Sequence, residues 1–141
     1  MNVLVFGTFD HLHPGHLSLL QQASDRGDMF VVIARDQNVE RIKGHEPLQT
    51  EEERKRAIEE KFPDAHVVLG DSEDFLRPVR DINPDLILLG YDQRLPPGVA
   101  AKDLPCPVER LGAFHPEKYK SSLRRSGQRA PSSGSGQAVD N

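Results

Sequence analysis

The sequence contains one cysteine, Cys106, and no tryptophan, and aromatic residues make up only 6% of its 141 positions. A single thiol excludes an intramolecular disulfide and a cysteine-based zinc site. No apolar run approaches the roughly 20 residues that a membrane-spanning helix needs. The N-terminal MNVLVFG lacks the basic and long apolar segments of a secretory signal. We therefore expect a cytoplasmic protein with no membrane partner.

An excess of positive charge is also missing, since 18 Lys and Arg stand against 22 Asp and Glu. Proteins that bind nucleic acid non-specifically are usually basic, so we expect no nucleic-acid partner. The length fits one domain. Residues 126–141, SGQRAPSSGSGQAVDN, hold too little apolar surface to offset the entropy of ordering. We expect a folded domain over residues 1–125 and a disordered Ser/Gly-rich tail over 126–141.

Short apolar runs alternate with longer polar segments along the domain. The runs are continuous rather than alternating, which is typical of strands buried on both faces of a parallel sheet: Asn2–Phe6, Met29–Ala34, His66–Leu69 and Leu86–Leu89. The segments between them have helix composition: Gly15–Arg26, Thr50–Phe62 and Glu73–Ile82. A fifth strand is expected at Pro107–Leu111 and a last helix at Lys118–Arg125. This order predicts an α/β fold, a single doubly wound parallel sheet with right-handed crossovers.

Glycine or aspartate follows each of the first four expected strands. Both residue types are common in turns, so any one of these loops is weak evidence by itself. All four loops nevertheless lie at the carboxyl edge of the sheet, where doubly wound folds bind ligands at the point of strand-order reversal. The residues are Gly7 and Asp10, Asp36, Gly70 and Asp71, and Gly90 and Asp92. We expect the site at this edge.

The first of these loops reads GTFDHLHPGH and leads into a helix. It contains neither G-x-G-x-x-G nor the P-loop pattern, so neither glycine-rich phosphate motif is present. Pro14 suits a first helical turn, and Gly15 lets a phosphate approach the backbone N–H groups of the helix start. His13 and His16 are three residues apart and face the same side. The pattern predicts an anion cradle with two imidazole donors, against the plainer alternative of a helix start with two exposed histidines.

GTFD followed by HPGH resembles the HxGH nucleotidylyltransferase superfamily, whose members transfer a nucleoside monophosphate from a nucleoside triphosphate and release pyrophosphate. The resemblance implies a Rossmann-like sheet of the nucleotidylyltransferase type. It also implies that His13 and His16 bind the triphosphate and stabilise the transition state. By the same match, the backbone of Thr8 and Phe9 meets the nucleotide phosphates.

Later segments resemble the archaeal-type FAD synthases, which transfer AMP from ATP to FMN. They read ARDQNV from Ala34, then Lys43-Gly44, then Glu52 and Arg54, then PDLILLGYDQ from Pro84. Two alternatives remain open. One is a cytidylyltransferase acting on glycerol 3-phosphate or ethanolamine phosphate, and the other is a non-catalytic nucleotide-binding module on the same fold.

The resemblance also implies roles for residues outside the histidine motif. Lys43 lies in Gln37–Gln49, which we expect to be a long loop that closes over the triphosphate. Asp92 is expected to hold the ribose or the base edge, and Tyr119 to lie against the nucleotide. Ser121 is expected to cap the last helix and offer its N-terminus to the triphosphate. A divalent metal ion, expected to be magnesium, binds mainly through the ATP phosphates. Whether the chain forms a homodimer is left open.

Overall fold

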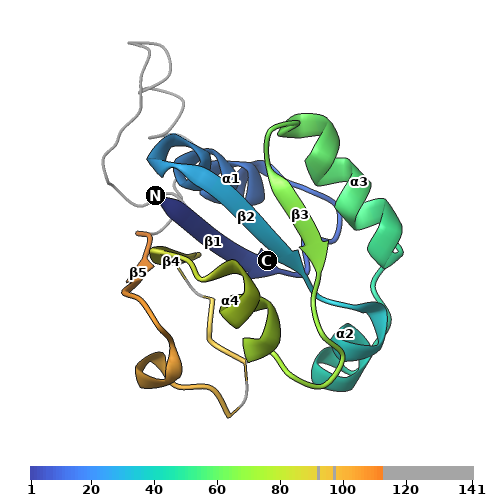
Figure 1. Cartoon of the computed structure of the whole chain (residues 1–141). Helices are drawn as coiled ribbons and strands as arrows, with labels where there is room; N and C mark the ends of the chain where they lie inside the picture. Colours follow the sequence, from blue (N-terminus) through green and yellow to red (C-terminus); the bar gives the residue numbers. More distant parts are fainter. Residues whose placement is uncertain (92, 97, 113–141) are drawn as a thin grey trace.

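A computed structural model describes residues 1–91, 93–96 and 98–112 of the chain (Figure 1). The tail expected over 126–141 and the helix expected at Lys118–Arg125 lie outside these residues. The elements, in chain order, are β1 (Asn2–Gly7), α1 (Pro14–Arg26), β2 (Asp28–Ile33), α2 (Asp36–Lys43), α3 (Glu51–Lys61), β3 (His66–Leu69), α4 (Leu76–Ile82), β4 (Leu86–Leu89), a 3-10 turn (Ala101–Asp103) and β5 (Val108–Arg110).

The five strands form one parallel sheet in the order β3-β2-β1-β4-β5. The chain builds outward from β1 through β2 to β3 and then returns across the sheet to β4 and β5. This confirms the predicted α/β fold with a doubly wound parallel sheet. The strand order reverses between β1 and β4, so their carboxyl ends form the switch point where ligands of such sheets bind.

Two apolar layers enclose the sheet because its central strands are buried on both faces. Val3 and Val5 of β1 face α1 and α3, where Leu19, Leu20 and Ile58 complete one core cluster. The alternate residues of β1, Leu4 and Phe6, face α4 and the segment after β4, where Val79 and Leu104 belong to the second cluster. Figure 1 shows α4 on the near face of the sheet. Within the described residues, no helix is both long and apolar enough to cross a membrane.

The prediction of a long loop over Gln37–Gln49 is wrong, because most of this stretch is helical. α2 covers Asp36–Lys43 and ends at Gly44, whose φ of 84° is the left-handed conformation that terminates helices. Only Val39 of this helix is buried. A polar helix with a single buried residue leaves no apolar periodicity in the sequence, and this is why composition suggested a loop.

The helix expected at Glu73–Ile82 starts later, at Leu76. Asp71 accepts hydrogen bonds from the N–H groups of Glu73 and Asp74, both at 2.8 Å. Asp74 in turn accepts from Leu76 N–H at 3.0 Å. These carboxylates hold the residues before α4 in turns, which is the local competition with helix that aspartate side chains offer.

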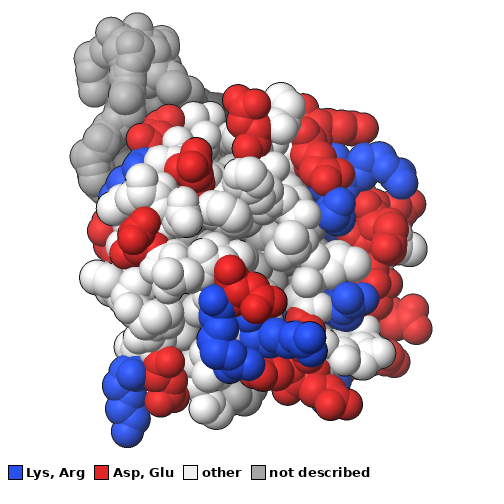
Figure 2. Space-filling model, in the orientation of Figure 1, with Lys and Arg blue, Asp and Glu red and all other residues white. Residues whose placement is uncertain are grey.

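Charged side chains of both signs are mixed over the face of the molecule that Figure 2 shows. Basic groups gather in its lower half beside acidic ones. The right-hand edge is mainly acidic. No continuous basic surface appears on this face, in keeping with the negative net charge of the sequence.

Candidate active site

The loop between β1 and α1 has an unusual backbone. Phe9 and His11 take φ angles of 53° and 57°, in the left-handed region that residues other than glycine seldom adopt. Each such residue costs on the order of 1 kcal/mol and persists only where neighbours hold it. The Phe9 side chain is fully buried in the core cluster between the sheet and α1, and this burial anchors the loop.

Arg54 holds this loop from α3. Its side chain has no exposed surface. Nη1 donates to Thr8 O at 2.9 Å, and Nε donates to Gln49 O at 3.2 Å. Nη2 pairs with Asp36 Oδ1 at 2.6 Å. One buried guanidinium therefore joins the β1–α1 loop, the segment before α3 and the start of α2.

A second set of contacts ties the loop to the residues just before α3. The Asp10 carboxylate accepts from the N–H groups of Leu48 at 2.8 Å and Gln49 at 2.9 Å. In return, Gln49 Oε1 accepts from His11 N–H at 2.9 Å. The segment that follows α2 is therefore fastened to the histidine loop at Asp10 and at His11, the second of the loop's two left-handed residues.

The Asp10 contacts predict an effect of pH on stability. Partial burial raises the pKa of Asp10, but the two backbone donors, together with His11 and Arg54, outweigh it and lower the pKa below its usual value. A carboxyl whose folded-state pKa is depressed adds stability above pH about 4 and loses it as the pH falls through the folded value. We expect Asp10→Asn to lower the free energy of unfolding at pH 7 by about 1–2 kcal/mol.

The same variant should lose less stability than wild type between pH 5 and pH 2, because it has no charge to lose at this position. Urea unfolding at each pH measures both quantities. Parallel stability curves for the two proteins would contradict this reading of Asp10.

The two histidines of the motif cap α1 reciprocally. His13 is the N-cap residue, and its Nδ1 accepts from the N–H groups of Gly15 at 3.2 Å and His16 at 3.4 Å. His16 Nδ1 accepts from His13 N–H at 3.3 Å. The sequence predicted that these helix-start N–H groups face an anion. In the structure the His13 ring accepts from the N–H groups of Gly15 and His16, so these two groups already have a partner within the loop.

The capping bonds determine which ring nitrogen carries the proton. A backbone N–H only donates, so each Nδ1 must be an unprotonated acceptor, and the proton of each neutral ring is on Nε2. The two rings are stacked with centroids 3.6 Å apart, and the His16 ring meets Phe9 edge-on at 5.5 Å. Nε2 of His16 is buried. The pair thus holds two N–H donors on fixed rings, and that of His16 is buried in a low-dielectric surrounding where a hydrogen bond is stronger.

The remaining predicted site residues fall into three groups. Thr8, Phe9, Pro14 and Gly15 lie with the histidines in the β1–α1 loop and the first turn of α1. Lys43 is exposed at the last turn of α2, and that helix is linked to the site at its other end by the pairing of Asp36 with Arg54. Asp92, Tyr119 and Ser121 lie outside the described residues.

Sequence analysis named Arg54 only as part of a resemblance and did not predict that it holds the site. Arg54 and Ile58 are the two buried residues of α3 and stand four positions apart. A basic residue at helical spacing from an apolar one was the available signal. Gln49 gave no signal, because its role depends on its bonds to Asp10 and His11, which are distant in the sequence.

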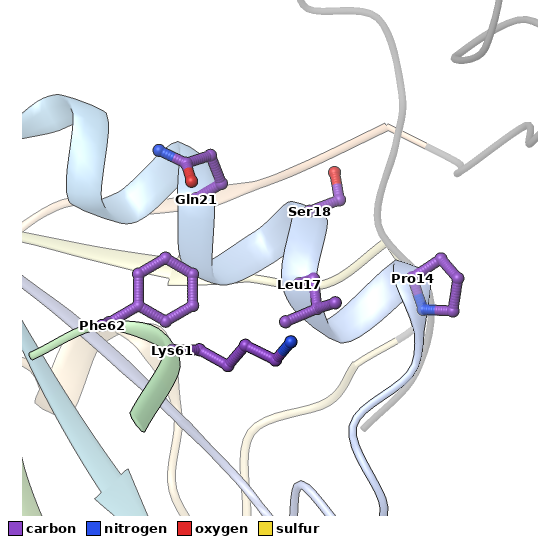
Figure 3. Close-up of a pocket in the computed structure, with 6 residues that line it drawn as sticks. All are labelled: Pro14, Leu17, Ser18, Gln21, Lys61 and Phe62. Carbon is purple, nitrogen blue, oxygen red and sulfur yellow. The ribbon is translucent and has the colours of Figure 1, made fainter. Parts of the chain in front are cut away.

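A hollow of about 400 Å³ lies beside α1. Figure 3 shows it between the first turns of α1 and the end of α3. Its lining residues are Pro14, Leu17, Ser18, Gln21, Lys61 and Phe62. Neither histidine lines it, so it is separate from the imidazole donors.

No three His, Cys, Asp or Glu side chains gather into a metal-binding group among the described residues. The part of the chain that the structure covers therefore offers no cage for a cation made of protein ligands alone. A cation at this site would take most of its ligands from elsewhere, and phosphate oxygens and water are the ligands that magnesium prefers.

Comparison with known proteins agrees with this geometry. The model of the cytidylyltransferase-like family matches residues 4–103. The chain is 38% identical over 128 residues to a FAD synthase of Methanosphaerula palustris, covering 86% of this chain and 82% of that protein. It is 46% identical over 92 residues to a FAD synthase of Ferroglobus placidus, covering 64% of this chain and 59% of that protein, which is less than two thirds of its length.

A solved structure also resembles the fold. The lipopolysaccharide core biosynthesis protein of Thermoplasma volcanium superposes with a TM-score of 0.71 at 29% identity. The match covers 82% of this chain and 98% of that one.

Proposed function

The chain is a nucleotidyltransferase that belongs to the cytidylyltransferase-like family and, within it, to the FAD synthases, and on that premise we propose that it transfers AMP from ATP to FMN. The products are FAD and pyrophosphate. The substrates follow from the FAD synthases that the chain resembles over most of its length.

One observation supports the proposal above the others. The reciprocal cap places two imidazoles, each with its proton on Nε2, at the start of α1 beside the switch point of the sheet. In the proposed complex, Nε2–H of His13 and of His16 donate to the phosphate oxygens of ATP. The backbone of Thr8 and Phe9, with Pro14 and Gly15, forms the wall on which the triphosphate lies.

The chemical step needs no general base. The phosphate of FMN has its second pKa near 6 and is largely a dianion at neutral pH. One of its oxygens attacks the α-phosphorus of ATP, a new P–O bond forms, and the bond to the bridging oxygen of the β-phosphate breaks with its electron pair. Catalysis is then positioning and stabilisation of the charge that builds up on the phosphates. A divalent cation carried by the ATP phosphates would reduce the repulsion between the two anions.

Asp92, Tyr119 and Ser121 keep their proposed roles on the resemblance alone. Asp92 would hold the ribose or base edge, Tyr119 would lie against the nucleotide, and Ser121 would bring a helix start to the triphosphate.

Incubation with ATP, magnesium and FMN, followed by chromatographic detection of FAD, tests the activity. Parallel reactions replace ATP by CTP and FMN by glycerol 3-phosphate or ethanolamine phosphate, with pyrophosphate release as the common readout. The expected result is that FAD forms from ATP and FMN and that CTP does not replace ATP. Pyrophosphate release with CTP and a phosphorylated alcohol, but not with ATP and FMN, would replace the proposal by the cytidylyltransferase reaction.

Lys43→Ala should lower kcat/KM for ATP at least about tenfold without unfolding the protein. The side chain is exposed at the end of α2, so its loss leaves no cavity. Its charge would attract the triphosphate from a fixed helix rather than from a mobile loop. Lys55→Ala is the matched control, because Lys55 pairs with Glu59 on the outer face of α3. Equal efficiencies for the two variants would remove Lys43 from the site.

A further inference from the structure

The pairing of β1 with β4 is much shorter than the pairing of β1 with β2. β1 and β2 are in register from Asn2 to Gly7, whereas β1 and β4 share only the pairs Val3–Leu86 and Leu4–Ile87. In the same register, Phe6 would face Leu89 and its carbonyl would accept from the N–H of Gly90. The two strands separate before that hydrogen bond can form.

The side chain of Gln93 occupies the place of the missing bond. Its Nε2 donates to Phe6 O at 2.6 Å, and its Oε1 accepts from Gly90 N–H at 3.0 Å. The orientation of the carboxamide is unambiguous, because a carbonyl only accepts and a backbone N–H only donates. Gln93 is 9% exposed. One carboxamide is therefore inserted between the ends of the two strands, and both backbone groups remain satisfied.

The loop that carries Gln93 is held from its other side by β5. The guanidinium of Arg110 lies against the carbonyl oxygens of Gly90, Tyr91 and Gln93. The bonds from Arg110 thus hold the loop so that the Gln93 side chain stays between the two strand ends.

We propose that Gln93 is a positioning residue that holds the carboxyl ends of β1 and β4 apart for the nucleotide, by taking the place of the hydrogen bond that would join the two strand ends. This inference rests on the proposed function only in placing a nucleotide at the switch point. Gln93 makes its bonds to backbone and acts through the strands, so it need not touch the substrate. Without the carboxamide, Phe6 O and Gly90 N–H bond directly, and the loop that carries the histidines moves toward Gly90.

Gln93→Ala tests this. We expect the dissociation constant of ATP, measured by calorimetry with no acceptor present, to rise at least tenfold, and KM for ATP to rise with it while kcat changes much less. The melting temperature should stay close to that of wild type, because the strands recover the lost bonds with each other, and the N–H of Gly90 should exchange more slowly. Gln37→Ala, on the exposed face of α2, is the matched control.

Gln93→Glu gives a readout that general loss of packing would not produce. A carboxylate can accept from Gly90 N–H but cannot donate to Phe6 O, whereas the protonated acid can do both. We expect weak ATP binding at pH 8 and recovery toward wild type as the pH falls to about 5, expressed as the ratio of variant to wild-type affinity at each pH. Gln37→Glu should show a constant ratio.

Unchanged ATP affinity in Gln93→Ala, or a pH-independent ratio for Gln93→Glu, would overturn the proposal. If Gln93→Ala does not fold, the pH ratio of Gln93→Glu decides alone. The outcome is separable from the proposed function: wild-type protein that binds ATP but makes no FAD leaves the test of Gln93 intact, whereas wild-type protein that binds no nucleoside triphosphate contradicts the function itself.

Discussion

His16→Ala is expected to lower kcat about 10²–10³-fold and to change the dissociation constant of ATP much less. The reason is the state of the ring. Nδ1 is bound to His13 N–H, so the buried Nε2 carries the proton and can donate to charge that develops in the transition state. A donor of this kind contributes most where charge increases during the reaction. Rapid-quench turnover of ATP with FMN, together with calorimetric ATP binding, measures both quantities.

His16 also caps α1, so the catalytic effect must be separated from a structural one. Alanine removes the cap bond to His13 N–H and should cost about 1 kcal/mol of stability. His16→Gln is the matched variant, because glutamine at this helix position can reach back to the N-cap N–H as in an ordinary capping box. We expect His16→Gln to recover the stability but not the turnover. Recovery of turnover by glutamine would mean that the ring acts only as a cap.

Arg54→Met is expected to cause the largest loss of stability, about 3 kcal/mol, seen as a fall of roughly 10 °C in the melting temperature. Methionine fills similar space but leaves Thr8 O and Gln49 O without the donors that Arg54 supplies, and it leaves Asp36 without its cation. The estimate is at the lower end for a buried pair, because the Asp36 side chain is 41% exposed and water can solvate it. Thermal and urea unfolding measure the change.

Two further variants identify which part of Arg54 matters. Arg54→Lys keeps the charge but cannot direct donors to three separate acceptors, so we expect an intermediate stability. Asp36→Asn combined with Arg54→Met in a double-mutant cycle isolates the ion pair from the bonds to backbone. A stability of Arg54→Met within 0.5 kcal/mol of wild type, the range of an ordinary surface substitution, would show that the loop does not depend on this residue.

Features that depend on residues close together in the sequence were predicted, whereas features without a local signal were not. The strands at His66–Leu69 and Leu86–Leu89 lie where the continuous apolar runs predicted them, because such runs specify burial on both faces of a sheet. The helix start at Pro14 followed from local chemistry in the same way. α2 was missed because its single buried residue, Val39, produces no periodic signal.

The site shows the same division. The histidine motif could be recognised from ten consecutive residues, and the structure places it at the switch point that the strand order creates. The reciprocal use of Nδ1 was not foreseen, because it depends on ring orientation. The contacts of Arg54 with Thr8, and of Gln93 with Phe6, join residues far apart in the chain, and a sequence pattern does not contain such pairings.

The bond from Arg54 to Thr8 spans 46 positions of the chain and has a consequence for the order of folding. The left-handed turns at Phe9 and His11 are unfavourable by themselves and hold their shape only when α3 has packed against the sheet. A growing chain that has emerged from the ribosome only as far as β2 therefore contains the whole histidine motif without its geometry. The catalytic loop matures after synthesis of α3, so a nascent chain halted before that helix should have no capacity to bind nucleotide.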